Sequence, residues 1–393
     1  MLQRLTRRFI EAFRKCDRIL LLLCIIATVF GGLMIASSTN GYDEGSLRYM
    51  LVHFGASAMG IFFYLLMSSV DTNWFSEKRT HLVIFNTVLL LLLIPFGVRI
   101  SGNRSWLSFP FLPFNIQPAE ICKITYILIM ASVMSSHQNN ISSPKAVGHM
   151  LGHLILLFGI NYIISGDMGV SLIFAFIFVA MTYSGGVNLI WYGLAAAIIV
   201  IAFPIIWGFI LEDYQKKRIM VLFDPSLDEY GTGAMYHTIR AMRSLTGGGL
   251  SGQGLFEGNR TQSGALFAQH TDYIFASIGE ELGFLGCAAV LILLGLIVAR
   301  CIWVGVHSPD YLRRLVCFGA AAALIFQIIV NVGMCIGVMP VIGLTLPFIS
   351  YGGSSIITLY AMLGLVSGVY ARPSPTSHER YIHAPIYYQG GHL

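Results

Sequence analysis

Long apolar stretches, separated by short polar segments, recur along the whole chain. Each stretch is about twenty residues long, which is the length that an α-helix needs to cross the hydrocarbon core of a bilayer. The pattern therefore predicts an all-α, polytopic membrane protein with ten transmembrane helices, whose size reflects the number of spans. The expected spans are residues 19–38, 48–69, 81–98, 117–135, 147–164, 168–185, 188–211, 273–300, 314–338 and 354–371.

The spans divide the chain into three parts. Residues 1–18 are basic and carry leucine and phenylalanine at helical spacing, so we expect an amphipathic helix on the membrane surface. The alternative is a flexible basic tail that only sets the orientation of the spans in the membrane. Residues 19–371 form the ten-span domain, with one large outer loop at about 212–271 between spans 7 and 8. Residues 372–393 are expected to be a disordered cytoplasmic tail.

The charges of the connecting loops predict the orientation of the spans. Lysine and arginine gather in alternate loops, on the same side as the N-terminus, and the positive-inside rule makes that side the cytoplasm. These residues are Lys78, Arg79, Lys145, Arg300, Arg313 and Arg314. Both termini are then cytoplasmic. Two outer segments, 99–115 and 212–271, are also basic, which suits an anionic head group or, as the alternative, general contact with phospholipid.

Composition excludes several classes of function. The chain is 56% hydrophobic and only 11% charged, against about 25% charged residues in a typical soluble domain. Its 7 cysteines are scattered, and no close pair has the spacing of a metal or redox site. No basic patch interleaved with aromatic residues points to nucleic acid.

The large outer loop carries two short motifs. The apolar residues of 231–245 fall on one helical stripe, which predicts a short amphipathic helix. That stripe comprises Met235, Ile239, Met242 and Leu245, and Arg240 and Arg243 lie off it. The glycine-rich run 247–254 permits tight turns and close approach of the backbone to a ligand. No Gly-Lys-Ser/Thr follows, so this run is not a P-loop.

Ionisable residues within apolar spans are costly and usually face a partner or a cavity. Glu120 and Lys123 lie three residues apart on one face of the fourth span. They either belong to a functional site or form a structural ion pair whose two charges neutralise each other. Asp272 opens the eighth span, where a carboxylate commonly serves as the N-cap of a helix. Asp167, between the fifth and sixth spans, is also expected to cap a helix.

Two adjacent glutamates lie further along the eighth span. Glu280 and Glu281 fall about 12 Å deeper than Asp272, at 1.5 Å per residue. Neighbouring helical residues point about 100° apart, so these two side chains do not easily share a partner. We interpret both as structural, bonding polar groups of neighbouring spans.

Three blocks of the sequence resemble the SEDS family (shape, elongation, division and sporulation), which includes RodA, FtsW and SpoVE. The most specific block is Ser350-Tyr-Gly-Gly-Ser-Ser355 with the preceding Asn331, Pro340, Gly343 and Pro347. A second block combines Arg104-Ser-Trp-Leu107 with Gln117-Pro-Ala-Glu-Ile-Cys-Lys123. The third combines His270-Thr-Asp-Tyr-Ile-Phe-Ala276 with Gly279-Glu-Glu-Leu-Gly283.

The resemblance implies a peptidoglycan glycosyltransferase that polymerises lipid II at the outer face of the bacterial cytoplasmic membrane, for elongation, division or sporulation. It also implies a class B penicillin-binding transpeptidase as partner. Asp272 matches the family's essential aspartate and is the expected general base on the attacking sugar hydroxyl. Glu120 and Lys123 match the family's Glu and Lys beside the site. The expected cations for the leaving pyrophosphate are Arg104, Lys123, Arg240 and Arg243, with a divalent cation such as Mg²⁺ as a further candidate.

The chain departs from the family pattern at several positions near these motifs. Ala268 replaces the glutamate of Leu-Pro-Glu, and Gly166 replaces the proline of Gln-Pro-Asp. In the large loop, Tyr236-His237 replaces Tyr-Gln, and Arg240-Ala241 replaces Gln-Ser. Two alternative functions stay open. One is a flippase or transporter for lipid II, which would need ionisable groups deep in a central cavity, whereas the charges here gather near the outer edge. The other is a catalytically silent scaffold of the cell-wall machinery, which these substitutions favour and the presence of Asp272 opposes.

Overall fold

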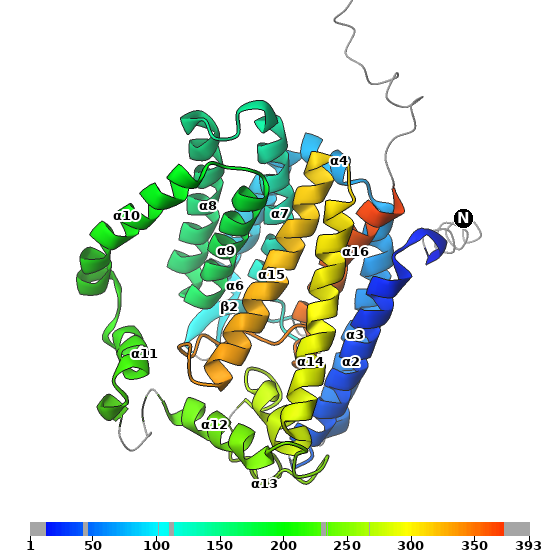
Figure 1. Ribbon diagram of the computed structural model, residues 1–393, viewed down its shortest axis with the longest axis vertical. Helices are drawn as coiled ribbons and strands as arrows, with labels where there is room; N and C mark the ends of the chain where they lie inside the picture. The colour runs from blue at the N-terminus through cyan, green and yellow to red at the C-terminus, as the bar shows by residue number, and fades with distance from the viewer. Residues whose placement is uncertain are drawn as a thin grey trace, which may run out of the picture.

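The computed structural model describes residues 13–41, 46–100, 102–109, 114–228, 233, 235–266 and 268–372. Most of the amphipathic segment expected at 1–18 and nearly all of the tail expected at 372–393 lie outside these residues. Within the described part, the fold is a bundle of α-helices with a two-stranded sheet (Figure 1). The helical, polytopic membrane fold predicted from hydropathy is confirmed.

Each expected span corresponds to a helix. Nine helices of the described residues are long and apolar enough to cross a bilayer. The remaining expected span is α9, which is apolar but has only 17 residues, so the count of ten stays a prediction. The long helices are α2 (Arg18–Ser38), α3 (Ser46–Ser69), α5 (Arg79–Leu91) with α6 (Leu93–Phe96), α7 (Pro118–Ser136), α8 (Pro144–Ser165), α9 (Met168–Ser184), α10 (Leu189–Ile205), α14 (Ile274–Val306), α15 (Tyr311–Cys335) and α16 (Gly353–Ala371).

Shorter helices occupy the connections. The loop between α10 and α14 contains α11 (Asp213–Phe223), the 3₁₀ turn η3 (Pro225–Asp228), α12 (Tyr236–Gly248) and α13 (Asn259–Gln262). The other short elements are α4 (Thr72–Glu77), the 3₁₀ turn η1 (Gln138–Asn140) and the π-helical turn η2 (Ile206–Ile210). In Figure 1, α12 and α13 cover the lower end of the bundle, below α14 and α15.

Helices α7, α15 and α16 form the centre of the bundle, and α10 lies at its edge. Most of α7 and α16 is buried, whereas α10 has no buried residue and stands at the left edge of Figure 1. Helix α7 is central even though Glu120 and Lys123 make its sequence the least apolar of the expected spans. These two charges neutralise each other within the helix, so the bundle can bury them.

A hairpin that the hydropathy pattern does not predict follows α6. Strands β1 (Gly97–Ile100) and β2 (Asn103–Leu107) pair antiparallel, with Gly97 opposite Leu107 and Ile100 opposite Asn103. Leu107 also forms a bridge with Ile116, just before α7. The hairpin thereby carries its polar residues to the same end of the bundle as the start of α7.

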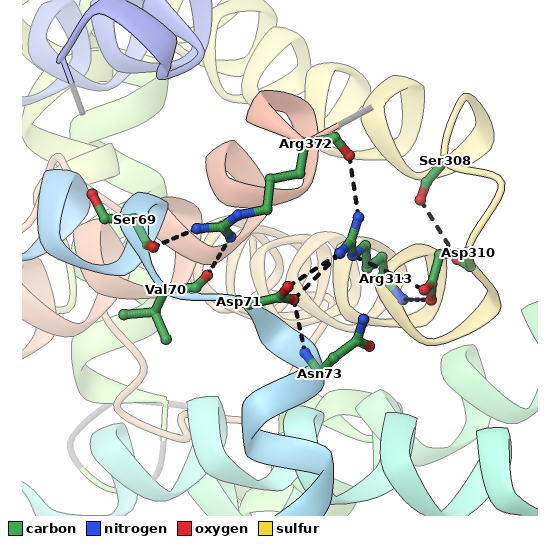
Figure 2. Close-up of polar contacts among 8 residues, drawn as sticks. All are labelled: Ser69, Val70, Asp71, Asn73, Ser308, Asp310, Arg313 and Arg372. Atoms are coloured by element: carbon green, nitrogen blue, oxygen red, sulfur yellow. Dashed lines mark hydrogen bonds and ion pairs between the residues drawn. The ribbon is translucent and has the colours of Figure 1, made fainter. Parts of the chain in front are cut away.

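A cluster of ion pairs closes the opposite end of the bundle (Figure 2). The guanidinium of Arg313 donates hydrogen bonds to both carboxylate oxygens of Asp71, at 3.3 and 3.4 Å, and to the carbonyl of Arg372, at 3.2 Å. Nearby, Arg300 forms a 2.8 Å ion pair with the buried Asp17. Residues from both ends of the described chain and from two predicted inner loops therefore lie at one end of the molecule, as the alternation of charged loops predicts.

The amphipathic helix predicted in the large loop is present as α12, but a different face of it is buried. Its buried residues are Thr238, Ala241, Ser244 and Gly248. The predicted apolar stripe is only partly buried. Small side chains allow α12 to pack closely on α14: a Cβ built at Gly248 would lie 1.8 Å from the carbonyl oxygen of Gly279. Helix α12 therefore packs against protein through its small residues.

The glycine-rich run at 247–254 binds the protein's own backbone. Helix α14 is broken at Gly283, whose φ is 67° and ψ is −164°. Around this break the backbone N–H groups of Gln253 and Gly254 donate to the carbonyls of Glu280 and Glu281, at 2.9 and 3.0 Å. These two N–H groups are therefore bonded within the fold, while approach of the rest of the run to a ligand stays a prediction.

Glu280 and Glu281 are structural, as predicted. The carboxylate of Glu280 accepts hydrogen bonds from the N–H groups of Arg260 and Thr261, at 2.9 and 3.0 Å, in the first turn of α13. This contact replaces an N-cap side chain, since the N-cap residue of α13 is glycine. Glu281 accepts from the hydroxyl of Ser37 in α2, at 2.6 and 2.7 Å. Both buried carboxylates therefore join the loop and α2 to α14.

Candidate active site

Asp272 lies in the turn immediately before α14, and its carboxylate does not cap that helix. The N-cap residue of α14 is Tyr273, and no side chain makes a capping hydrogen bond there. The capping alternative for Asp272 is therefore wrong. Within the described residues, no group donates a hydrogen bond to its carboxylate, which leaves those oxygens available for chemistry.

The backbone around Asp272 is held in place by the specific C-terminal motif. Asn331 in α15 donates from its side-chain amide to the carbonyl of Asp272, at 2.9 Å, and to that of Leu344, at 2.7 Å. Ser350 donates to the carbonyl of Thr271, at 2.6 Å. The N–H of Tyr351 donates to the carbonyl of His270, at 2.9 Å. Residues far apart in sequence thus fix the backbone turn that carries Asp272.

The environment of Asp272 favours a proton on its carboxylate. Removal from water, with a smaller contribution from the negative charge of Asp167, raises the pKa of Asp272 to about 6. A carboxylate with this pKa is still ionised at neutral pH, and it is a stronger base than an ordinary aspartate. Burial lowers the pKa of the neighbouring His270 to about 4, so that imidazole is neutral at the same pH.

Asp167 is the second carboxylate of the site, and its role as a helix cap is confirmed. Its Oδ1 accepts from the N–H of Val170 at 3.1 Å, in the first turn of α9. Its Oδ2 accepts from Ser105 at 3.3 Å and from Gln117 at 3.4 Å. Burial raises the pKa of Asp167, and Glu120 adds to the rise. The negative charge of Asp167 thus helps to raise the pKa of Asp272, and that of Glu120 helps to raise the pKa of Asp167.

The predicted pair Glu120 and Lys123 is formed in the first turns of α7. Lys123 Nζ lies 2.8 Å from Glu120 Oε2, and both side chains are almost fully buried. Thr358 of α16 donates a hydrogen bond to the same carboxylate oxygen, at 3.1 Å. The Lys123 ammonium has no other hydrogen-bond partner among the described residues. A small contribution of Glu120 to the raised pKa of Asp167 links the pair to the cluster of Asp167 and Asp272, and its role in the site stays a prediction.

Three consecutive residues of the loop between α15 and α16 connect the parts of this cluster. The carbonyl of Val341 accepts a hydrogen bond from the Arg218 guanidinium, at 3.0 Å. Ile342 packs against Gly169 beside Asp167, and Gly343 faces the Asp272 carboxylate. Gly343 has φ 73°, which a glycine adopts without strain. The loop therefore lies against both carboxylates and against a cation of α11.

The predicted phosphate-binding arginines occupy different environments. Arg104 donates to the carbonyl of Gly97 within its own hairpin, at 3.1 Å. Arg240 donates to the carbonyl of Ala265 and stacks on the ring of Tyr236, 4.2 Å from its centroid. Arg243 is exposed. No sequence pattern distinguishes Arg218 from the other loop cations, since only the fold brings it to the loop beside Asp272.

One departure from the family pattern, at Gly166, has a local explanation, and a second, at Ala268, lies in a turn with positive φ. Gly166 ends α8 with φ 71°, and its N–H donates to the carbonyl of Tyr162 at 2.9 Å. A proline has neither that φ nor an N–H, so the chain makes a different turn here while keeping Asp167 as the cap of α9. Ala268 has φ 50°, and its carbonyl accepts from the N–H groups of Thr271 and Tyr273.

The described residues offer no ready-made metal site. Among them, no group of three or more His, Cys, Asp or Glu side chains is placed to hold an ion. Mg²⁺ usually takes one or two carboxylates together with substrate phosphates, so the divalent cation expected from the resemblance stays a prediction. We therefore derive no catalytic step through a metal.

Comparison with known proteins identifies the family. The sequence model of the FtsW, RodA and SpoVE family, described as "Cell cycle protein", matches residues 17–374. The chain belongs to this family. The SEDS resemblance carried by the three sequence blocks is thereby confirmed over nearly the whole chain.

Curated relatives in this family carry enzyme names. The chain is 31% identical over 356 residues to the peptidoglycan glycosyltransferase MrdB of Escherichia coli K12, covering 90% of this chain and 93% of the relative. It is also 31% identical over 374 residues to the probable peptidoglycan glycosyltransferase FtsW of Thiomicrospira cyclica, covering 90% and 91%.

Solved structures of the family share the fold. A chain from a structure described as "Structural coordination of polymerization and crosslinking by a peptidoglycan synthase complex" superposes with a TM-score of 0.75, at 26% identity, covering 90% of this chain and 97% of that one. A mutant of the rod shape determining protein RodA from Thermus thermophilus superposes with a TM-score of 0.67, at 25% identity and the same coverage. The bundle is thus the family fold.

Proposed function

We propose that this protein is a peptidoglycan glycosyltransferase that polymerises lipid II at the outer face of the bacterial cytoplasmic membrane. The observation that carries the proposal is the carboxylate of Asp272. Asp272 lies in the turn immediately before α14, and its carboxylate caps no helix. The pKa of this carboxylate is raised to about 6. The names of the curated relatives give the reaction class.

The proposed reaction joins two lipid-linked sugars. Asp272 accepts the proton of the attacking sugar hydroxyl while that oxygen forms a bond with the anomeric carbon of the second substrate. The bond between this carbon and the lipid pyrophosphate breaks, and the pyrophosphate leaves with the electron pair. Asp272 then releases its proton to solvent. Every step uses groups of the protein and its two substrates.

Cations around the site stabilise the negative charge of the leaving pyrophosphate. Lys123 is buried with Glu120 beside Asp167, and Arg218 reaches the loop against Asp272. Arg104, Arg240 and Arg243 remain the further candidates predicted from the sequence. Arg240 is already bonded to Ala265, so it would have to exchange that contact for a phosphate oxygen.

The proposal includes an orientation and a partner. The ionic end of the bundle, with Asp71, Arg313 and Arg372, faces the cytoplasm, and both termini are cytoplasmic. The partner is a class B penicillin-binding transpeptidase. The likeness of this chain to one from a peptidoglycan synthase complex that couples polymerization and crosslinking supports such a partner. The enzyme serves cell elongation, division or sporulation.

The test is polymerisation of labelled lipid II by the purified protein, with and without the candidate transpeptidase. We expect glycan chains from the wild type and none from Asp272→Asn, whose amide cannot act as a base. A folded protein that moves lipid II across vesicles without making glycan would favour the flippase alternative. A folded protein that does neither, even with its partner, would favour the scaffold.

A binding measurement separates the candidate phosphate ligands. Arg218→Gln and the double variant Arg240→Gln/Arg243→Gln are compared for binding to lipid II and to phosphatidylglycerol. We expect each to weaken lipid II binding more than phosphatidylglycerol binding. Equal losses for both lipids would indicate general attraction to anionic lipid, and no loss would remove these arginines from the site.

A further inference from the structure

A small cavity lies between α5, α7 and α8, among residues that the proposed reaction does not use. Its lining includes Asn86 and Thr87 of α5, Tyr126 of α7, and His153 and Leu157 of α8. The volume open to the centre of a water molecule is about 10 Å³. About this volume is the minimum that one ordered water requires.

Two buried polar atoms of the cavity wall lack partners. Tyr126 is only 1% exposed, and its hydroxyl makes no hydrogen bond with the described residues. The Nε2 atom of His153 is also buried and without a partner among them. Inside a bilayer no bulk water can satisfy such groups, so each one left unsatisfied opposes folding. A ligand that bonds to both atoms would remove this cost.

We propose that the cavity is a site for an internal water molecule that bridges the Tyr126 hydroxyl and His153 Nε2. The tyrosine hydroxyl can donate to the water, and the imidazole nitrogen accepts from or donates to it according to its tautomer. The amide of Asn86 lines the same cavity and supplies a third partner, while its Oδ1 accepts a hydrogen bond from Thr125 of α7. Ordered internal waters typically make about three such bonds.

Chemistry distinguishes water from the other occupant of a membrane cavity, a lipid acyl chain. A chain of methylene groups offers no hydrogen bond to Tyr126 or His153, whereas a water molecule can bond to both, and the space open to water centres, about 10 Å³, corresponds to a single water. The bound water joins α7 to α8 and α5. It lies near Tyr126, one helical turn from Lys123, so it also supports the helix that carries the Glu120–Lys123 pair.

A cavity-filling substitution tests the proposal through the sign of its effect. Filling a dry apolar cavity stabilises a protein, whereas displacing a bonded water destabilises it. We expect Thr87→Leu to lower the Tm of the full-length protein in detergent. In a Tyr126→Phe background the same substitution should lower Tm less or raise it. Thr87→Val is the matched control, since it removes the same hydroxyl, which bonds to Val83, without filling the cavity.

Equal Tm shifts for Thr87→Leu in the two backgrounds, or stabilisation in both, would overturn the proposal. A structure of the wild type at a resolution that shows ordered water provides the direct measurement. We expect a single density within hydrogen-bond distance of Tyr126 Oη and His153 Nε2, and its loss in Tyr126→Phe. An elongated density would identify an acyl chain, and no density in the wild type would show a dry cavity; either result refutes the water site.

Discussion

At the scale of single residues, Asp272 and Asp167 differ in what their carboxylates bind. Asp167 accepts hydrogen bonds from Val170, Ser105 and Gln117, whereas the Asp272 carboxylate accepts none from the described residues. An aspartate kept out of water without such bonds has a raised pKa and opposes stability when it is charged. This cost makes structural sense at a catalytic position, where the carboxylate must accept a proton from the substrate.

The raised pKa predicts the pH dependence of polymerisation. Only ionised Asp272 is a base, and its pKa is about 6, so the rate should fall as pH decreases through 6. One unit below that pKa, about a tenth of the sites would remain active. The measurement is the single-turnover rate with labelled lipid II from pH 5 to 8. A rate that stays constant down to pH 5 would exclude Asp272 as a base with this pKa.

Replacement of Asp272 should stabilise the protein even though it abolishes activity. A folded-state pKa above the unfolded value of 3.8 means that ionised Asp272 destabilises the fold at high pH, and that this penalty disappears as the carboxyl protonates. We expect Asp272→Asn to have a higher Tm than the wild type at pH 8. The difference should shrink toward pH 4. A lower Tm for the variant at pH 8 would show that Asp272 has a structural role.

Removing the neighbouring charge should shift the pH profile. Asp167→Asn keeps a side chain that can cap α9 but removes the negative charge that helps raise the pKa of Asp272. We expect the acidic limb of the rate profile to move to lower pH, with the protein still folded. A limb that moves to higher pH, or stays in place, would contradict electrostatic contact between the two carboxylates.

At the scale of elements, α7 combines a central position with a buried ion pair. Breaking a buried pair leaves one charge unpaired and typically costs about 3–5 kcal/mol. Glu120→Gln and Lys123→Met should therefore each lower Tm markedly and reduce activity. The double variant should recover much of the Tm but not the activity, if the charges serve the reaction. Recovery of both would assign the pair to stability alone.

The contact between α12 and α14 depends on glycine at the crossing point. A methyl group at Gly248 would collide with the carbonyl of Gly279, while Gly193 in α10 has open space around its Cβ position. Gly248→Ala should lower both Tm and the polymerisation rate, because it pushes α12 away from the part of α14 that follows Asp272. Gly193→Ala, the control, should be neutral or slightly stabilising, by about 0.5–1 kcal/mol at most. Equal effects of the two substitutions would mean that α12 is free to move.

Sequence reasoning located the long helices well and the faces of the loop elements poorly. Periodicity identified α12 and its apolar stripe with Met235 and Leu245, but it did not indicate which face packs against α14. The buried face instead carries Thr238, Ala241 and Ser244, since a close approach to α14 requires small side chains. The hairpin of β1 and β2 was missed because its short strands show no clear alternation of polar and apolar residues.

At the scale of the whole molecule, the two ends of the bundle differ in chemistry. One end holds the arginine pairs with Asp17 and Asp71, and the other holds Asp272 and the glycine-rich loop. The sequence predicted this division from loop charges and from the family motifs. It did not predict that Arg218 reaches Val341, or that Asn331 binds Asp272, because both contacts join segments far apart in the chain.

The orientation of these ends can be measured with a thiol reagent that does not cross membranes. All seven native cysteines are buried, so their background reaction should be low. We expect Ser251→Cys, exposed in the large loop, to react in cells with an intact cytoplasmic membrane. Asn139→Cys, exposed between α7 and α8, should react only after permeabilisation. The reverse pattern would invert the proposed topology.

The hydrogen bonds from the C-terminal motif to the Asp272 turn have a consequence for biosynthesis. Glu120, Lys123 and Asp167 enter the membrane early in translation, but Asn331, Ser350 and Thr358, which hold or cover the site, are synthesised last. A nascent chain therefore carries an unshielded ion pair until its final helix is inserted. Catalytic competence arises only with the completed polypeptide, so a prematurely terminated product lacks an assembled site.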